Sequence, residues 1–422
     1  MRRVLITFLS SVLVTGMALV AAPAEAAVYS PTNKTIFNNP KGSKAQELKI
    51  ITELDRTIDA TPRGATIKMA QYLFDIDSTA NKLVAAHRRG VNVQILIDRG
   101  NNTKQSDKVK KAIGTNKKAK SFVTTCRKSC MSSTSSVMHS KLYLFSQAGR
   151  SRLVSIVASA NPYTGNTFKS WNNSHTIVGD KRIYDSLNRY FVDLTRDKDN
   201  LNYYRTTASG KYKLYYFPRK AVKNKVTVVP LDVMNHVTCS DPGKGYGKDG
   251  KTEIKVAMWG WSAARLDVAR QLWALHNRGC KVTVILNSGR TNPKVISTLV
   301  KRSSKRGVMP VYDVWQDKNK NGIGEFYMHH KMYQINGKWF GHSKTKVVYT
   351  GSQNFTGPGQ LANDDIILRI KDNATYNAYS GEMTSIKNRY GKKLTRAPRV
   401  ASLSSSSSEP SIYDESQWLM DR

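Results

Sequence analysis

The chain has 422 residues, with 67 Lys and Arg against 30 Asp and Glu, and a formal net charge of +37. Hydrophobic residues make up 40% and aromatic residues 9%, which excludes a wholly disordered chain, and the length suits about two or three domain-sized units. Only one stretch, at the N-terminus, is apolar enough to span a membrane, so a protein with several membrane spans is excluded. The charge predicts an anionic partner, either nucleic acid, lipid headgroups or a cell-wall polyanion.

The N-terminal stretch has the features of a secretion signal. Arg2 and Arg3 precede a mostly apolar run over 4–20, and Ala24 and Ala26 flank Glu25 in a small-x-small cleavage site. We therefore expect residues 1–26 to be a signal peptide and the mature protein to be secreted to the extracellular space. An uncleaved membrane anchor is the alternative.

A helix is predicted over 46–61, because Leu48, Ile51, Leu54 and Ile58 recur at the spacing of one helix face. A corresponding helix in the second half is expected over 226–237, where Pro230 argues against a single long helix.

The most informative feature is an internal repeat. Residues 67–100 and 254–289 share a short strand, an aromatic turn, an amphipathic helix, the pattern His-x-Arg-Gly-x-x-Val and a second apolar strand. Gly90 and Gly279 follow the two helices as their C-terminal caps. The repeat predicts an α/β fold of two pseudo-symmetric lobes, each a mixed sheet flanked by helices.

We expect the first lobe over 27–205 and the second over 206–398. The remaining residues 399–422 are rich in serine and polar residues, and they predict a disordered tail.

The chain contains four cysteines, and an even count in an exported chain favours disulfides over zinc. Four cysteines allow three connectivities. We predict Cys126–Cys130, which closes a small loop, and hence Cys239–Cys280.

The repeat also carries chemically useful side chains. His139-x-Lys141 in the first half corresponds to His329-x-Lys331 in the second, and Ser-x-Asn follows each of them. The Ser-x-Asn residues are Ser159 with Asn161 and Ser352 with Asn354. On a strand, residues i and i+2 point to the same face, so each imidazole should project beside an ammonium group.

These residue types suit phosphodiester chemistry. Lysine binds phosphate oxygens, asparagine donates hydrogen bonds to them, and histidine attacks phosphorus or protonates a leaving oxygen. Two facing halves would place two sets around one phosphodiester, so we expect a site that needs no metal and no cofactor. Tyr72 and Phe74, and their counterparts Trp259 and Trp261, are interpreted mainly as packing residues. Asn336-Gly337 predicts a hairpin turn.

The chain resembles the phospholipase D superfamily of phosphodiesterases over residues 35–395. The family signature is His-x-Lys-x4-Asp followed by Gly-Gly/Ser-x-Asn, and the segment 350–356 matches its second part closely. The resemblance implies a phospholipase D-like fold and a two-step reaction through a phosphohistidine. It implies a catalytic set of His139, Lys141, His329, Lys331 and Asp365. The implied phosphate-binding residues are Lys141, Asn161, Lys331, Asn354, Ser159 and Ser352.

The sequence departs from the family pattern in several places. Ser146 and Asn336 replace the signature aspartate in the two halves. Asp365 is the expected carboxylate partner of His329, whereas 173–175 offers no acid to His139, which therefore lacks a carboxylate partner unless one comes from elsewhere in the chain. Family order makes His139 the nucleophile, but local chemistry favours His329 as the better supported imidazole, and both assignments stay open here.

The leading interpretation is a secreted phosphoric diester hydrolase that hydrolyses or transphosphatidylates phospholipids. Its expected partners are phospholipid headgroups or a membrane surface, and we expect a monomer. The charge favours one alternative, an extracellular metal-independent nuclease that binds nucleic acid. The loss of both signature aspartates favours another, a catalytically weak polyanion-binding protein.

Overall fold

The computed structural model describes residues 29–396, apart from 101, 128, 133–135, 221–227 and 323. The predicted signal peptide and the predicted tail lie outside the described residues. Across the part of the chain that is described, none of the helices combines the length and apolar character needed to cross a membrane.

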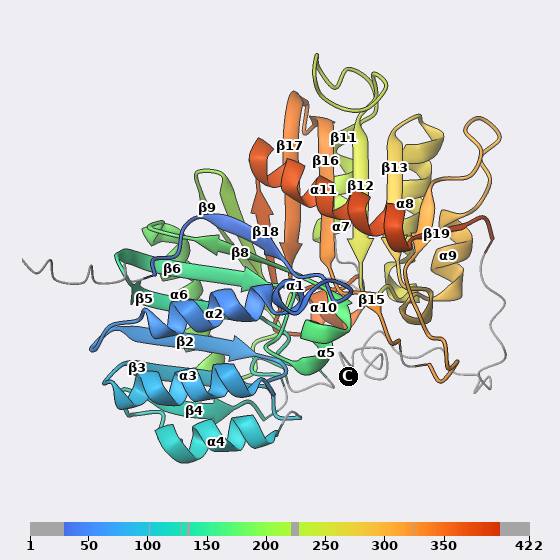
Figure 1. Ribbon diagram of the computed structural model, residues 1–422. Helices are drawn as coiled ribbons and strands as arrows, with labels where there is room; N and C mark the ends of the chain where they lie inside the picture. The colour runs from blue at the N-terminus through green and yellow to red at the C-terminus, as the bar shows by residue number, and fades with distance from the viewer. Residues whose placement is uncertain are drawn as a thin grey trace, which may run out of the picture.

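The first lobe contains a seven-stranded mixed sheet in the order β1-β8-β6-β5-β2-β3-β4 (Figure 1). The pairs β2–β3 and β3–β4 are parallel, and the other pairs are antiparallel. The elements of this lobe are β1 (Lys34–Phe37), α1 (Lys44–Glu47), α2 (Lys49–Asp59), β2 (Thr66–Gln71), α3 (Asp77–Arg88), β3 (Asn92–Ile97), α4 (Lys104–Ile113), β4 (Phe122–Thr125), β5 (Leu142–Ala148), β6 (Ser151–Ala158), α5 (Thr164–Phe168), β7 (Ser170–Trp171), β8 (Asn173–Ile177) and α6 (Lys181–Thr195).

The second lobe repeats this arrangement with the strand order β19-β14-β13-β12-β16-β17-β18-β10-β9, and β11 pairs with β16. Here β12–β13 and β13–β14 are parallel. The elements of this lobe are β9 (Arg205–Ser209), β10 (Tyr212–Tyr216), α7 (Val229–Asn235), β11 (Val237–Thr238), β12 (Glu253–Met258), η1 (Ala263–Arg265), α8 (Leu266–Asn277), β13 (Lys281–Leu286), η2 (Ser288–Arg290), α9 (Pro293–Leu299), β14 (Val311–Asp313), β15 (Tyr327–Met328), β16 (Lys331–Trp339), β17 (His342–Gly351), α10 (Pro358–Leu361), β18 (Ile366–Ile370), α11 (Asn373–Tyr390) and β19 (Lys392–Leu394). The predicted fold class of two similar α/β lobes is confirmed.

The sequence repeat corresponds to β2-α3-β3 in one lobe and β12-α8-β13 in the other. Gly90 and Gly279 follow the two helices with φ of 85° and 101°, a backbone conformation that side chains other than glycine rarely adopt. The predicted helix over 46–61 is formed as α1 and α2, and α7 begins with Pro230 in its first turn.

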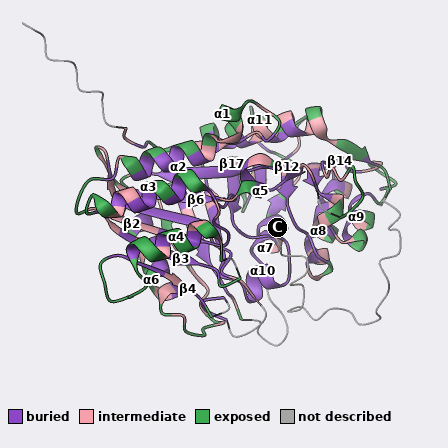
Figure 2. Ribbon diagram, turned by 60° about the horizontal axis from the view of Figure 1, so that its bottom comes forward, coloured by how far each residue is buried: buried purple, intermediate pink, exposed green. Residues whose placement is uncertain are grey.

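The two lobes are joined by apolar packing and by strand pairing. One buried cluster combines Leu142 and Leu187 of the first lobe with Leu214 and Leu368 of the second. The short strands β7 and β15 pair in parallel across the junction. In Figure 1, β15, α5 and α10 lie where the two sheets meet, and Figure 2 shows that the strands are buried while many outward helical faces are exposed.

The hairpin predicted at Asn336-Gly337 is wrong. Both residues lie within β16, and the reversal into β17 occurs at Phe340 and Gly341, whose φ angles are 47° and 77°. Two consecutive left-handed residues are what a tight hairpin between twisted strands requires.

Both predicted disulfides are present, Cys126–Cys130 in the first lobe and Cys239–Cys280 in the second. Among the described residues there is no free cysteine. Cys280 is buried in the core of the second lobe, and the bridge fastens the residue before β13 to the segment that follows β11.

Removing the second disulfide should destabilise its lobe. The bridge spans 41 residues of sequence, and loop-closure entropy for that length predicts a loss of about 3–4 kcal/mol in the free energy of unfolding. Urea denaturation of the Cys239→Ser, Cys280→Ser double variant measures this loss. The Cys126→Ser, Cys130→Ser variant is the matched control, and its short loop predicts a smaller loss of about 2 kcal/mol. A loss below about 1 kcal/mol for the long loop would contradict the prediction.

Candidate active site

The two His-x-Lys pairs are buried where the lobes meet. His139, Lys141 and His329 are 0% exposed, and Lys331 is 2% exposed. The amide of His139 donates to the Asp364 carbonyl at 3.0 Å, and the amide of His329 donates to the Trp171 carbonyl at 2.9 Å. The backbone of each motif is thus held by the opposite lobe.

His139 has a carboxylate partner from the second lobe. Its Nδ1 lies 3.0 Å from Oδ1 of Asp365, and the hydroxyl of Ser352 donates to the same oxygen. The predicted pairing of Asp365 with His329 is therefore wrong, and the acid partner of His139, which the sequence left open, comes from the second lobe. The reason is that the backbone before β18 crosses the junction, where Asp364 forms a bridge with Met138, and this directs Asp365 toward His139.

His329 has an amide partner from the first lobe. Its Nδ1 lies 2.7 Å from Oδ1 of Asn172, and the hydroxyl of Ser159 donates to that oxygen at 3.0 Å. Asn172 follows Ser159 by 13 residues, and Asp365 follows Ser352 by the same number. Asn172 therefore occupies the position that Asp365 occupies in the other half. The better supported imidazole is His139, which reverses the local-chemistry assignment made from sequence.

Each lysine lies beside its own histidine. The strand predicted over each motif is not formed at the histidines, because β5 begins after Lys141 and β16 begins at Lys331. Lys141 donates through Nζ to the His139 carbonyl at 2.8 Å, and its Nζ is 5.4 Å from the centre of the Tyr72 ring. Lys331 Nζ lies 2.6 Å from Nε2 of His329 and donates to the carbonyl of the same residue at 3.2 Å.

The two predicted amide groups are also buried. Asn161 donates through Nδ2 to Oδ1 of Asn166 at 3.0 Å and accepts from the amide of Leu73 at 3.3 Å. Asn354 is 2% exposed, and within the described part of the chain its Oδ1 has no hydrogen-bond partner. Phosphate binding by either amide, and by Ser159 or Ser352, stays a prediction.

A continuous series of contacts joins the two histidines. His329 contacts Asn172, and the next residue, Asn173, accepts from the Thr350 hydroxyl at 2.8 Å. Thr350 lies on β17 two residues before Ser352, which contacts Asp365 and through it His139. These contacts link the two His-x-Lys motifs across the junction, and their arrangement around one phosphodiester stays a prediction.

Two further carboxyl groups lie near His139 and were not identified from sequence. Asp98, directly after β3, accepts from the Met138 amide at 2.8 Å, and burial raises the pKa of Asp98 to about 6. Asp364 accepts from the Cys130 amide at 2.6 Å, and burial raises its pKa well above the usual range. A signal existed for Asp98, since it directly follows a repeat strand and lies two residues before Gly100, which matches Gly289 in the second half.

The aromatic residues divide between site and core. The ring of Tyr72 lies 5.5 Å from that of His139, and Trp259 lies 5.2 Å from His329. These two flank the imidazoles, which the packing interpretation did not predict. Phe74 and Trp261 belong to hydrophobic core clusters, as predicted.

The replacements of the signature aspartate have structural contacts. Ser146 accepts from the Thr66 amide at 2.8 Å and so fastens the edge of β2 to β5. Asn336 is buried on β16 and donates weakly to the Gly247 carbonyl at 3.5 Å. Neither contact involves a His-x-Lys residue.

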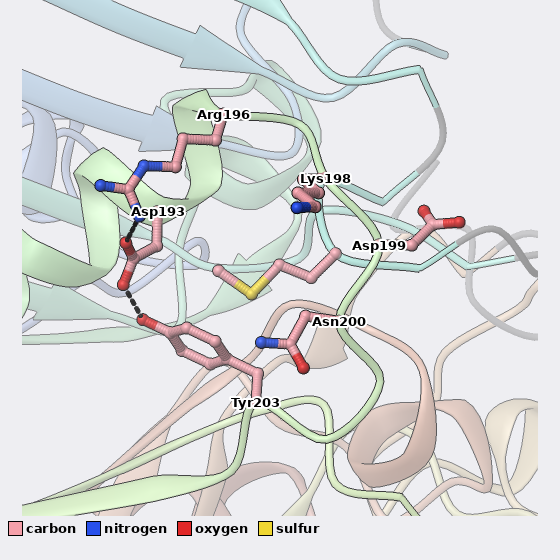
Figure 3. Close-up of a pocket in the computed structure, with 7 residues that line it drawn as sticks. Asp193, Arg196, Lys198, Asp199, Asn200 and Tyr203 are labelled. Atoms are coloured by element: carbon pink, nitrogen blue, oxygen red, sulfur yellow. Dashed lines mark hydrogen bonds and ion pairs between the residues drawn. The ribbon is translucent and has the colours of Figure 1, made fainter.

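A separate pocket of about 330 Å³ lies near the end of α6 (Figure 3). In it, Asp193 accepts from the hydroxyl of Tyr203 at 2.7 Å and from Arg196 at 2.9 Å. The residues that line it are Met131, Asp193, Arg196, Lys198, Asp199, Asn200 and Tyr203. None of them is a predicted site residue, so this pocket adds nothing to the two-histidine arrangement.

Comparison with known families identifies the family to which the chain belongs. A family model described as cardiolipin synthase, PLD-like domain, matches residues 54–195 and 248–387, one match in each half. The chain belongs to the phospholipase D superfamily. Members of the superfamily act on phosphodiesters. A comparison with curated proteins gives no match.

Two solved structures, a phosphatidylserine synthase and a polyphosphate kinase, share the overall fold of this chain. Phosphatidylserine synthase from Haemophilus influenzae Rd KW20 has a TM-score of 0.57 and 10% identity over 87% of this chain and 89% of that one. Polyphosphate kinase from Porphyromonas gingivalis has a TM-score of 0.53 and 12% identity over 85% of this chain, which spans about half (50%) of the kinase's length. Nuc from Salmonella typhimurium, a phospholipase D family member, has a TM-score of 0.29 and 17% identity over 39% of this chain and 95% of that one.

Proposed function

We propose that the protein is a secreted phosphodiesterase of phospholipase D type, which hydrolyses phospholipids or transfers their phosphatidyl group to an alcohol. The observation that carries this proposal is a pair of buried imidazoles, each with a lysine beside it. His139 contacts the carboxylate of Asp365, and His329 contacts the amide of Asn172.

In the first step His139 is the nucleophile. Asp365 accepts the proton on Nδ1, which leaves the Nε2 lone pair to attack phosphorus, and the carboxylate stabilises the cationic imidazole that forms. A P–N bond forms as the P–O bond to the leaving group breaks. His329, protonated on Nε2, gives that proton to the departing oxygen.

In the second step the roles of His329 reverse. Its neutral Nε2 accepts a proton from water or an alcohol, whose oxygen attacks phosphorus. The P–O bond forms, the P–N bond breaks, and His139 is regenerated. Lys141 and Lys331 supply positive charge to the phosphate oxygens in both steps. Because the site is buried and its dielectric constant is low, this electrostatic interaction is stronger than it would be in water.

The assembly of the site supports a phospholipid as the proposed substrate. Both His-x-Lys motifs come from one chain, so a monomer has a complete site, and a site of this kind accommodates one phosphodiester. A phospholipid at a membrane surface presents one phosphodiester per molecule. The net charge of +37 would also favour an anionic membrane surface.

A substrate comparison tests the proposal. The mature protein is offered dispersed phosphatidylcholine and, separately, single- and double-stranded DNA, at 200 mM salt with EDTA. We expect release of free choline, because the lysines and amides supply the electrostatic stabilisation that a metal would otherwise provide. Activity that disappears in EDTA and returns with Zn²⁺ or Mg²⁺ would overturn the metal-independent mechanism.

The second candidate function is an extracellular nuclease with the same chemistry, which the net charge favours. A nuclease holds several backbone phosphates, so with about six contacts its DNA affinity should fall ~10³-fold or more between 50 and 200 mM salt. DNA cleavage in EDTA without choline release would replace the phospholipase proposal with this one. Salt-sensitive DNA binding without turnover of any substrate would instead favour a polyanion-binding protein.

A further inference from the structure

The surroundings of the two histidines differ in charge although the repeat makes them equivalent. Asp98 accepts from the Met138 amide at 2.8 Å, and Asn287 accepts from the Met328 amide at 3.1 Å. The repeat also makes Asp365, which contacts His139, equivalent to Asn172, which contacts His329. Each of these carboxyl groups thus has a neutral counterpart.

The third acidic position follows the same rule. The Asp364 carbonyl receives the amide of His139, and the Trp171 carbonyl receives that of His329. A carboxyl group beside the first histidine is therefore replaced by an indole beside the second. The strongest contrast is between Asp365 and Asn172, because these two side chains contact the imidazole rings directly.

The orientation of Asn172 is fixed by its neighbours. Its Nδ2 donates to the Asn166 carbonyl at 2.9 Å, and to the hydroxyl and carbonyl of Ser170 at 2.9 and 3.2 Å. Carbonyl oxygens cannot donate, so the NH2 group must face them and Oδ1 must face His329. Because Oδ1 only accepts, the contact at 2.7 Å requires a proton on Nδ1 of His329.

We propose that Asn172 is a positioning residue that fixes His329 with a proton on Nδ1 and, being neutral, makes its imidazolium a readier proton donor than a carboxylate partner would. The inference rests on the proposed function and deepens it, because it assigns the different roles of the two histidines to their partners.

The groups that face His329 agree with this role. Lys331 on β16 brings its ammonium to 2.6 Å from Nε2, and a like charge disfavours the protonated imidazole. Trp259 after β12 and Tyr327 on β15 contribute neutral rings at 5.2 and 6.3 Å. A carboxylate at position 172 would oppose the lysine and hold the proton on His329.

The reaction needs this proton to move twice. His329 releases it to the leaving oxygen in the first step and regains one from water or alcohol in the second. A partner that held the imidazolium tightly, as Asp365 does for His139, would slow the release, so the amide suits the acid and the carboxylate suits the nucleophile.

The test is the pH dependence of Asn172→Asp. The basic limb of kcat/KM reports deprotonation of the general acid. We expect the limb to move up by about one pH unit or more in Asn172→Asp, since an adjacent opposite charge shifts a titration by that amount. In Asn172→Asp, turnover of substrates with poor leaving groups should fall below the wild-type rate. Release of a good leaving group such as 4-nitrophenol, which needs no acid, should stay within about threefold of the wild-type rate.

Asn172→Ala is the matched variant, because it removes the acceptor without adding charge. It should slow turnover of ordinary esters and leave the basic limb in place. A second readout is NMR titration of ¹⁵N-histidine-labelled protein, with the His329 signals assigned through His329→Ala. In wild-type protein the neutral His329 should carry its proton on Nδ1, and Asn172→Asp should raise its titration midpoint.

The proposal would be overturned if Asn172→Asp changed neither the basic limb of the kcat/KM pH profile nor the titration midpoint of His329. Asn172 would then be a purely structural residue. That result differs from failure of the proposed function, in which wild-type protein releases no choline from phosphatidylcholine whatever stands at 172. If Asn172→Asp does not fold, the NMR titration of wild-type protein still tests the proposal. A neutral His329 that carries its proton on Nε2 and not on Nδ1 would overturn it.

Discussion

Replacing either His139 or His329 with alanine should lower kcat/KM by at least ~10³-fold, in line with the loss of cooperating catalytic groups. The two residues act in sequence on the same phosphorus, one forming the P–N bond and the other moving the proton, so neither can substitute for the other. Steady-state hydrolysis of phosphatidylcholine, or of DNA if only DNA is cleaved, measures the effect.

His236→Ala is a suitable control for this pair. His236 lies at the exposed end of α7, where its ring stacks on Phe340, and it contacts no His-x-Lys residue. Its variant should keep activity within about twofold. If His139→Ala or His329→Ala keeps more than a tenth of the wild-type rate, the two-histidine mechanism is wrong.

Asp365→Asn should lower the rate of the first step by ~10²–10⁴-fold, the range seen when the acid that orients a catalytic histidine becomes an amide. The amide can turn its NH2 group toward His139, which would place the ring proton on Nε2 and remove the nucleophilic lone pair. It also cannot stabilise the cationic imidazole. Rapid-quench measurement of the first turnover separates this step from the second.

The neighbouring Asp364→Asn is the control for that prediction. Burial raises the pKa of Asp364 and favours its uncharged form, so an amide there changes the charge little while its oxygen still accepts from the Cys130 amide. We expect a loss below about tenfold. Equal losses in the two variants would mean that Asp365 acts only through the local fold.

The elements and the chemistry within each half could be predicted from sequence. Apolar periodicity and the glycines after the helices define β2-α3-β3 and β12-α8-β13 because these signals are local. The two-residue period of a strand predicts Lys141 beside His139, and the contact is present although both residues lie just before β5 and not within it. Repetition of the same motifs raised their specificity far above that of a single His-x-Lys.

The partners of the histidines could not be predicted, because they come from the opposite lobe. The repeat offset relates equivalent positions of the two halves, whereas the contact of Asp365 with His139 depends on how β7, β15 and the segment before β18 pack across the junction. Asn172 can be matched to Asp365 by its place 13 residues after Ser159, but that match does not show which histidine it contacts. The misplaced hairpin at Asn336-Gly337 has a similar cause, since pairing with β17 continues β16 through that dipeptide.

The most direct test of the account is to identify the histidine that carries phosphorus. A phosphodiester with a 4-nitrophenolate leaving group is mixed with His329→Ala, quenched in alkali, digested and mapped by mass spectrometry. Because this leaving group needs no acid and the variant has no base for the second step, we predict a burst of one equivalent of 4-nitrophenol and an adduct on His139. His139→Ala should give neither. An adduct on His329 in wild-type protein, or turnover with no adduct on either histidine, would contradict the account.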